Sequence, residues 1–331
     1  EFEIPVADKI LKKIDSLDST NPIDYDDSRS VSYIKRSTNA CVNIGANNVP
    51  VVIAASSEPF QDCVPDYIFT EQSSNIDNSQ KYIIPYHLWI DSKKTNLFPF
   101  FESLQAYRKA DTKSEELNFV QLDMNRLTNT IVSSMPTNVV FVLNIEGYSS
   151  YDMKKSFNFF EKHNILNPVI LKGVYNSKDF EEIVVESSID FGSLLLEGYG
   201  NGLWIESLNY SNKINELSFS ILQNTRTRIF KTDYISCPSC GRTKFNLQET
   251  TALVKKHTSH LKGLKISVMG CIVNGPGEMA DADYGYVGSG IGLISLYKGQ
   301  NVVKKNIISK NAVDELIALI KDNNDWVEPK I

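Results

Sequence analysis

The sequence predicts an α/β fold in two parts, a barrel-like parallel sheet followed by a small α+β domain. Between about residues 49 and 207, β-rich apolar runs alternate with amphipathic stretches, and strand and helix recur about every 25 to 30 residues. That alternation is typical of a parallel sheet covered by helices. Near Arg228 the sequence changes to short apolar runs separated by many glycines, which indicates a second domain. With 331 residues and 42% hydrophobic content, the chain can bury two cores.

The strands of the first part, residues 1–227, are predicted from runs rich in β-branched and aromatic residues. They cover residues 49–55, 82–90, 119–124, 139–145, 169–175 and 193–197. Helices are predicted over 152–163, 179–187 and 214–228, where apolar residues recur at spacings of three and four. A closed TIM-like barrel usually needs a longer chain. The sequence therefore predicts a degenerate, barrel-like arrangement, with an open sheet as the alternative.

The second part, residues 228–331, begins with a predicted strand at 232–235 that leads into a cysteine-bearing turn. A helix over 247–257, a strand over 264–268 and a glycine-rich loop follow. A hairpin near 293–303 and a helix over 312–322 complete this small α+β domain. Residues 288–292 contain three glycines, but they precede a strand rather than a helix. They therefore predict a hairpin turn and not a dinucleotide-binding loop.

The charge balance argues against nucleic acids or anionic membranes as general partners. The 34 Lys and Arg residues face 40 Asp and Glu residues, which gives a net charge of -6. No apolar run approaches the roughly 18 residues that span a bilayer, and no secretion signal is apparent, so we expect a soluble chain. Five cysteines are an odd number for a secreted disulfide framework, and a reducing compartment fits better.

Three of the cysteines lie close to the C-terminus in a pattern that favours a metal site. Cys237 and Cys240 stand in Ser-Cys-Pro-Ser-Cys-Gly, and thiolates separated by two residues can turn toward one metal from a single tight turn. Alone, this motif also fits structural zinc or a thioredoxin-like redox pair. One further cysteine, Cys271, lies downstream, so zinc would need a histidine such as His257 or His260.

Three thiolates would leave one iron of a cubane cluster without a cysteine ligand, and Glu278 is the candidate for that position. Glu278 follows Cys271 by seven residues across a Gly-Pro-Gly turn that lets the backbone bend sharply. Two sites are therefore possible. One is an iron–sulfur cluster on the three cysteines and Glu278, and the other is a structural zinc on the same cysteines and His260.

These motifs resemble the C-terminal part of the 4-hydroxy-3-methylbut-2-enyl diphosphate synthase family. The resemblance rests on Cys-Pro-Ser-Cys at 237–240 and Cys-Ile-Val-Asn-Gly-Pro-Gly-Glu at 271–278, and it continues through residues 194–200, 221–228 and 280–288. The sequence Gly-Glu-Met-Ala-Asp-Ala-Asp after the cysteine loop resembles the large, three-domain version of the family. The resemblance then implies that the first part is mostly its inserted middle domain. Residues 3–14 resemble the helix that closes the catalytic barrel, and we expect that barrel to precede Glu1.

The resemblance implies an iron–sulfur oxidoreductase of the methylerythritol phosphate route to isoprenoids. In that family, 2-C-methyl-D-erythritol 2,4-cyclodiphosphate is opened to (E)-4-hydroxy-3-methylbut-2-enyl diphosphate by two one-electron transfers with loss of water. Ferredoxin or flavodoxin supplies the electrons. Because the catalytic N-terminal barrel is missing from this chain, the chain alone is expected to be inactive. The implied compartment is a bacterial cytoplasm or a plastid-type organelle.

The same resemblance implies a role for each polar residue of the cysteine loops. Cys237, Cys240 and Cys271 are implied to hold a [4Fe-4S] cluster. Glu278 is implied to be the fourth ligand, which the substrate oxygen displaces. Asn274 is implied to contact the substrate.

Two arginines at the end of the predicted helix 214–228 form a second candidate site. Arg226 and Arg228 are implied by the resemblance to help hold the diphosphate, and a guanidinium fork suits that task. The alternative is that both arginines are solvated at a helix end, where positive charge is favourable.

Overall fold

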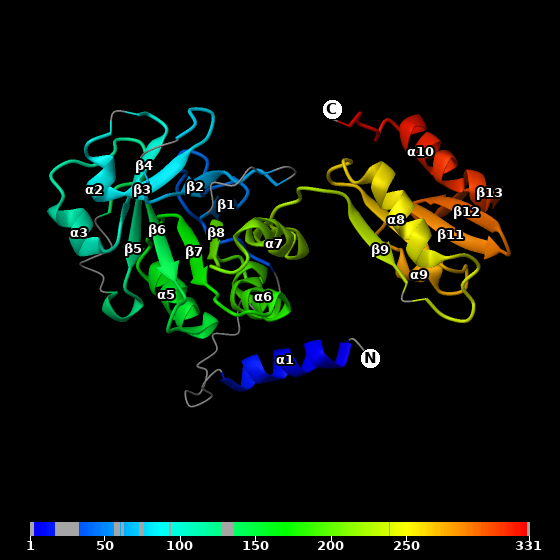
Figure 1. The fold of residues 1–331 in the computed structure, drawn as a ribbon, viewed down its shortest axis with the longest axis horizontal. Helices are drawn as coiled ribbons and strands as arrows, with labels where there is room; N and C mark the ends of the chain where they lie inside the picture. The colour runs from blue at the N-terminus through cyan, green and yellow to red at the C-terminus, as the bar shows by residue number, and fades with distance from the viewer. Residues whose placement is uncertain are drawn as a thin grey trace. The chain divides into compact units, whose positions relative to one another are not determined.

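The computed structural model describes residues 3–16, 33–55, 60, 63–72, 76–92, 94–127, 135–237 and 239–329. These residues divide into two units, Glu1–Arg228 and Ile229–Ile331, each built around its own core (Figure 1). None of the helices in the described residues combines the length and the hydropathy that crossing a membrane requires.

The first unit is a closed barrel of eight parallel strands. Neighbouring strands pair in sequence order, and the last returns to the first with Val51 opposite Gly202 and Ile53 opposite Trp204. The strands are β1 (Val51–Ala54), β2 (Tyr67–Phe69), β3 (Tyr82–Pro85), β4 (Leu97–Phe101), β5 (Asn118–Leu122), β6 (Val139–Asn144), β7 (Val169–Val174) and β8 (Gly202–Glu206). This closure confirms the barrel-like prediction and rules out the open sheet.

Helices cover the barrel unevenly. The first unit contains α1 (Glu3–Ser16), α2 (Tyr86–Trp89), α3 (Leu104–Lys109), the 3₁₀ turn η2 (Met124–Arg126), α5 (Ser150–Lys162), α6 (Phe180–Leu196) and α7 (Ser211–Asn224). Among the described residues, the elements after β3, β4 and β5 have 4, 6 and 3 residues, whereas α5, α6 and α7 have 13, 17 and 14. These short connections explain how eight strands close within a chain shorter than a TIM barrel normally needs.

Five of the six predicted strand regions contain a strand, and the sixth, 193–197, is wrong. Those residues continue α6, which buries Phe191, Leu194 and Leu195 at helical spacing. In the region 82–90 the strand ends at Pro85, and α2 follows. The sequence prediction also missed β2, β4 and β8. β2 has three residues, β4 contains a proline and β8 follows glycines, so each lacks a long β-rich run.

Large apolar side chains fill the barrel interior. Trp204 is completely buried, with its ring centre 4.7 Å from that of Phe69 and 5.3 Å from that of Phe100. Cys41 and Ile44 form an isolated β-bridge and belong to the same apolar cluster. Burial raises the pKa of the Cys41 thiol to about 12, so this cysteine stays protonated and acts as a small apolar group.

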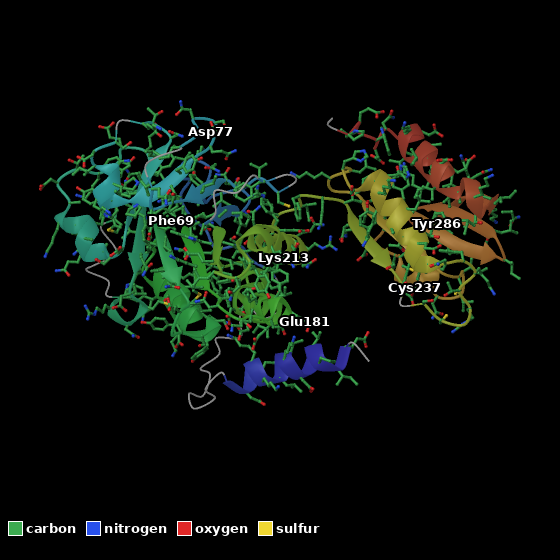
Figure 2. The ribbon with its side chains drawn as sticks, viewed as in Figure 1. Phe69, Asp77, Glu181, Lys213, Cys237 and Tyr286 are labelled. Atoms are coloured by element: carbon green, nitrogen blue, oxygen red, sulfur yellow. The ribbon has the colours of Figure 1, made fainter. Side chains whose placement is uncertain are left out.

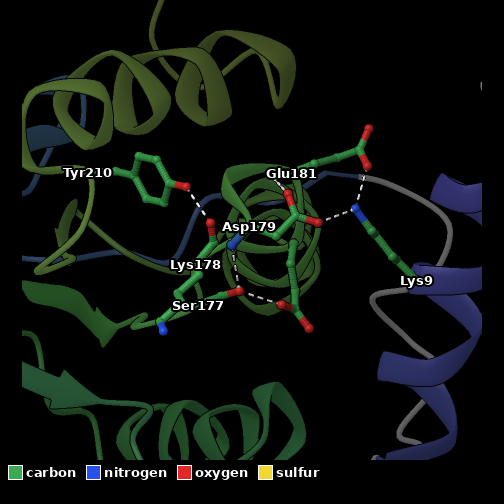
Figure 3. A network of polar contacts seen from close by, with 7 residues as sticks. Lys9, Ser177, Lys178, Asp179, Glu181 and Tyr210 are labelled. Carbon is green, nitrogen blue, oxygen red and sulfur yellow. Dashed lines mark hydrogen bonds and ion pairs between the residues drawn. The ribbon is translucent and has the colours of Figure 1, made fainter.

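Helix α1 contacts α6 through charged side chains (Figure 3). The Lys9 ammonium lies 2.6 Å from a carboxylate oxygen of Asp179 and also pairs with Glu181. Asp179 has a second role as the N-cap of α6, where it accepts a hydrogen bond of 3.0 Å from the backbone amide of Glu181. The acidic start of α6 therefore both caps that helix and binds the basic side chain of α1.

A second contact between α1 and α6 reaches a buried carboxylate. The Lys13 ammonium lies 3.2 Å from Asp190, which also accepts a hydrogen bond of 2.9 Å from the Tyr175 hydroxyl. The Asp190 side chain is only 3% exposed. Burial holds the pKa of Asp190 above its ordinary value, and Lys13 partly opposes this rise. The Lys13 ammonium thus stabilises the buried Asp190 carboxylate, to which the Tyr175 hydroxyl also donates.

The second unit is a five-stranded mixed sheet with the order β13-β12-β11-β10-β9. Strands β9, β10 and β11 are parallel, whereas β11, β12 and β13 are antiparallel neighbours. Its elements are β9 (Asp233–Ser236), α8 (Leu247–Thr258), β10 (Lys265–Met269), α9 (Gly275–Glu278), β11 (Tyr284–Gly290), β12 (Leu293–Lys298), β13 (Asn301–Ile308), η3 (Ser309–Asn311) and α10 (Ala312–Asp322). The predicted strands, hairpin and helices of this part are confirmed. The predicted glycine-rich loop instead contains the helical turn α9.

Side-chain alternation gives this sheet two different faces. Tyr284 and Tyr286 on β11 belong to the larger core, to which α8 and α10 also contribute. Val287, from the opposite face of β11, packs in a smaller cluster with Met269 and Met279. Met279 follows α9 directly, so the segment after Cys271 lies over this second face.

Replacing Lys13 by alanine is expected to destabilise the first unit, and more so at neutral than at mildly acidic pH. At neutral pH the buried Asp190 carboxylate would keep only the Tyr175 hydroxyl, at a cost of about 1–3 kcal/mol. Loss of Lys13 raises the pKa of Asp190 further, so the cost should fall as the pH drops through that pKa and the carboxyl becomes neutral. Urea unfolding followed by circular dichroism at the two pH values measures this effect.

The exposed Lys12 on the same helix provides the matched control, because Lys12→Ala removes the same charge. Its unfolding free energy should stay within about 0.5 kcal/mol of the wild-type value at either pH. Equal losses in both variants would show that the Lys13 contact with Asp190 contributes nothing specific.

Candidate metal centre

The three cysteines of the second unit lie on loops that leave the same edge of the sheet. Cys237 directly follows β9 (Figure 2). Cys271 follows β10 after a single glycine. These strands pair in parallel, with Ser236 opposite Val268. Because the carboxyl ends of parallel strands meet at one edge, residues distant in sequence are brought to the same place.

Backbone hydrogen bonds join the two cysteine loops at Gly270. The Gly270 amide donates to the Cys237 sulfur at 3.2 Å. The Gly270 carbonyl accepts a hydrogen bond of 3.1 Å from the Lys244 amide, which lies beyond the Cys-Pro-Ser-Cys turn. The residue before Cys271 is therefore held at both its polar groups by the loop that contains Cys237 and Cys240.

Gly270 is also confined on its other side by β11. Gly288 approaches so closely that a Cβ atom placed on it would lie 2.4 Å from the Gly270 carbonyl oxygen. A Cβ atom on Gly270 would in turn lie 2.7 Å from the Thr243 hydroxyl oxygen. No ordinary side chain fits at either position without displacing its neighbours, because the backbone of Gly270 lies against Gly288 and the side chain of Thr243 lies against Gly270.

The cysteines at this edge differ from the core cysteine in exposure and acidity. Cys237 and Cys271 are half-buried, Cys240 is exposed, and all three are free thiols. The Arg242 backbone amide, with a further contribution from its guanidinium, holds the pKa of the Cys240 thiol below its ordinary value. A lowered thiol pKa favours the thiolate that metals bind. The environment of Cys240 is thus the opposite of the environment of Cys41.

Asn274 and Glu278 lie at the two ends of α9 rather than in an extended loop. The Asn274 carbonyl accepts hydrogen bonds of 3.0 Å from the amides of Gly277 and Glu278. Pro276 occupies the first turn, a position where its missing amide costs nothing. Both predicted side chains are exposed. The structure therefore leaves them accessible on the segment that follows Cys271.

His260 lies at the other end of the sheet, which disfavours the zinc site that would include it. The Thr232 hydroxyl, just before β9, donates to the carbonyls of Thr258 and Leu261, so His260 sits near the start of that strand. Its ring packs edge-on against Trp326, with the centres 4.9 Å apart. Cys237 follows the end of β9, and four strand residues span about 13 Å. That separation is far longer than the roughly 2 Å bonds of a zinc ligand.

The described residues contain no group of three or more His, Cys, Asp or Glu side chains close enough together to hold a metal ion. The thiols therefore share an edge without converging on a point. Their chemistry nevertheless suits an iron–sulfur cluster, because all three are free thiols and backbone amides donate to the sulfurs of Cys237 and Cys240. The sequence interpretation missed Thr243 and Gly270, since only the folded chain brings them together.

The two predicted arginines lie in the first unit, and they differ from each other. The Arg228 guanidinium donates to both carboxylate oxygens of Asp66 and, at 3.0 Å, to the carbonyl of Pro50. It also lies over the Phe219 ring, 4.9 Å from its centre. Arg226 has a left-handed backbone with φ of 59° and lines a cavity of about 130 Å³. Arg228 is therefore not a solvated arginine, and the diphosphate role of both residues stays a prediction.

Comparison with known proteins agrees with this architecture. Residues 233–322 match the family model described as the GcpE protein C-terminal domain. The 4-hydroxy-3-methylbut-2-en-1-yl diphosphate synthase (flavodoxin) of Parabacteroides distasonis is 40% identical over 99% of this chain and 55% of its own length. The protein of the same name from Phocaeicola vulgatus is 37% identical over the same shares. The Leptospira interrogans protein is 49% identical over 54% of this chain and 27% of its own length.

The chain thus spans about 55% of the length of the relatives that match nearly all of it. The matched region includes both the barrel and the cysteine-bearing domain, and the family model covers the strands and loops that hold the three cysteines. Residues 233–322 therefore belong to the GcpE C-terminal domain family, and nearly the whole chain is similar to part of the 4-hydroxy-3-methylbut-2-en-1-yl diphosphate synthases.

Proposed function

We propose that this chain is the barrel-and-cluster portion of an enzyme that reductively opens 2-C-methyl-D-erythritol 2,4-cyclodiphosphate. The product is (E)-4-hydroxy-3-methylbut-2-enyl diphosphate. The ring carbon–oxygen bond breaks, two electrons and two protons are consumed, and the oxygen lost from the carbon skeleton leaves as water. The reaction therefore needs a donor of single electrons and a group that binds the departing oxygen.

The observation that supports this proposal is that hydrogen bonds at Gly270 join the two loops that contain the three cysteines. Two separate loops would supply Cys237, Cys240 and Cys271 to one [4Fe-4S] cluster, which would provide single electrons and a Lewis-acidic iron. Three thiolates would bind three of the four irons, which leaves the fourth iron for another ligand. Glu278 is exposed on the same segment as Cys271 and would fill that position.

The other residues of this portion would bind and orient the substrate. Asn274 is exposed at the start of α9 and offers a side-chain amide that can donate to an oxygen of the substrate. Arg226 would donate to the diphosphate, for which a guanidinium is suited. Arg228 could bind the diphosphate directly only if its guanidinium left Asp66 for a phosphate oxygen. Alternatively, Arg228 could stay paired with Asp66 and hold the backbone that positions Arg226. The first of these roles costs more, because Asp66 would lose its cation.

We also propose that the first unit is an inserted supporting domain and the second unit the cluster domain. The relatives are longer than this chain, which spans 55% of their length, and the remaining part would supply the catalytic acid and most of the phosphate-binding residues. The names of the relatives specify flavodoxin, which we infer as the electron donor, with ferredoxin as the alternative. This chain by itself would bind the cluster without turning over substrate.

Reconstitution without oxygen is expected to give about four iron and four sulfide per chain, with broad visible absorption. Cys271→Ser should lose most of this iron, because the remaining thiols both come from a single turn. Cys63→Ser, in the first unit, is the matched control and should bind iron as the wild type does. Metal analysis together with an absorption spectrum provides the measurement. One tightly bound zinc and no iron would overturn the redox function.

Replacing Glu278 by alanine is expected to change the cluster spectrum but not the amount of iron bound. The three thiolates remain, so the stoichiometry should stay near that of the wild type, whereas the iron that has no cysteine ligand acquires a different partner. Electron paramagnetic resonance of the reduced chain measures the change. Glu249→Ala, an exposed acid in the first turn of α8, is the control. Identical spectra for Glu278→Ala and the wild type would exclude Glu278 as a ligand.

A further inference from the structure

We propose that Thr243 is a positioning residue that ties the Cys240 turn to the Cys271 loop, so that both loops present their thiols to one cluster. The inference rests on the proposed function, because it concerns how the chain prepares the cluster site. Thr243 is not itself a ligand. Its side chain lies between the two loops and contacts both of them.

The polar side of Thr243 forms hydrogen bonds with Ser239 and Cys240. Its hydroxyl accepts a hydrogen bond of 3.1 Å from the Cys240 amide and lies 3.2 Å from the Ser239 hydroxyl. The Thr243 amide donates back to the Cys240 carbonyl at 2.9 Å. Ser239 has a left-handed backbone with φ of 70°, which is unfavourable for a residue with a side chain. The bonds from Thr243 stabilise the Cys240 turn in spite of that cost.

The side chain of Thr243 also packs on Gly270. A Cβ atom on Gly270 would lie 2.7 Å from the Thr243 hydroxyl oxygen and 2.9 Å from its methyl group. Thr243 thus fills the space that a side chain on Gly270 would need. The next residue, Lys244, hydrogen-bonds the Gly270 carbonyl, and Gly288 confines Gly270 from β11. The start of the Cys271 loop is therefore fixed by the packing of Thr243 together with these two backbone contacts.

This arrangement matters because a cluster must bind thiolates from two loops at once. If each loop is already ordered before the cluster binds, less conformational entropy is lost on binding. Residues that orient metal ligands typically change metal affinity by about 10- to 100-fold when they are replaced. Thr243→Val removes the hydroxyl and keeps the packing on Gly270, whereas Thr243→Ser keeps the hydroxyl. The two variants therefore separate the hydrogen bond from the packing.

The experiment compares iron loss from the anaerobically reconstituted chain. Thr243→Val is expected to release iron to a chelator about 10-fold faster than the wild type, and Thr243→Ser within about 3-fold of it. The control is Thr250→Val, a half-buried threonine on α8. It should match the wild type. A spectrum of the reduced cluster that shifts in Thr243→Val and returns in Thr243→Ser would confirm a role in positioning, because a purely structural threonine would not affect the cluster signal.

Further readouts keep the outcomes distinct. If the wild type binds iron and Thr243→Val loses it no faster, the positioning role is refuted while the cluster function stands. If the wild type binds no iron, the proposed function fails. Hydrogen exchange of the Cys240 amide in the metal-free chain then still tests the hydrogen bond to Thr243. An unchanged exchange rate in Thr243→Val would refute the positioning role. Should Thr243→Val not fold, Gly270→Ala provides the second variant. It displaces Thr243 from the opposite loop and should accelerate iron loss as well.

Discussion

The close approach of two backbones at Gly270 and Gly288 is the constraint on which the cysteine edge depends. Strands β10 and β11 run in parallel, and a side chain on Gly288 in β11 would clash with the carbonyl of Gly270, the residue that follows β10. This contact leaves the Gly270 amide free to donate to the Cys237 sulfur and its carbonyl free to accept from the opposite loop. The positions of Cys237 and Cys271 are thus consequences of sheet packing. The thiols require no dedicated scaffold beyond the three parallel strands and their loops.

The barrel unit contains a charged pair close to the carboxyl ends of its strands. In barrels of this kind, active sites form where the strands end. Near that end, the Lys172 ammonium lies 3.1 Å from Glu206 and 4.2 Å from the Trp204 ring centre. The buried cation is therefore neutralised by a carboxylate and shielded by an aromatic ring. This pairing agrees with a supporting role for the barrel and leaves the reactive chemistry to the cysteine edge.

Helix α1 illustrates how charge, rather than apolar burial, can attach an element. Its sequence is amphipathic, yet Ile4, Leu11 and Ile14 are 65%, 58% and 50% exposed. The helix contacts α6 through Lys9 and Lys13 instead. The Lys9 pairs are exposed and contribute little each, whereas the Lys13 pair reaches a buried carboxylate, whose stabilisation is worth more. The depth of the partner therefore decides which of these ion pairs holds the helix.

The sequence by itself determined the helices and strands with strong local periodicity, such as α8, β10 and α10, and it identified Cys237, Cys240 and Cys271. Local spacing is sufficient for both, because a helical face or a Cys-x-x-Cys turn forms among neighbours in the chain. Only the tertiary structure decided that the barrel closes, that His260 lies far from the cysteines and that Thr243 packs on Gly270. These outcomes depend on the pairing of strands distant in sequence. Such pairing leaves no local pattern, since its register is set by the whole sheet.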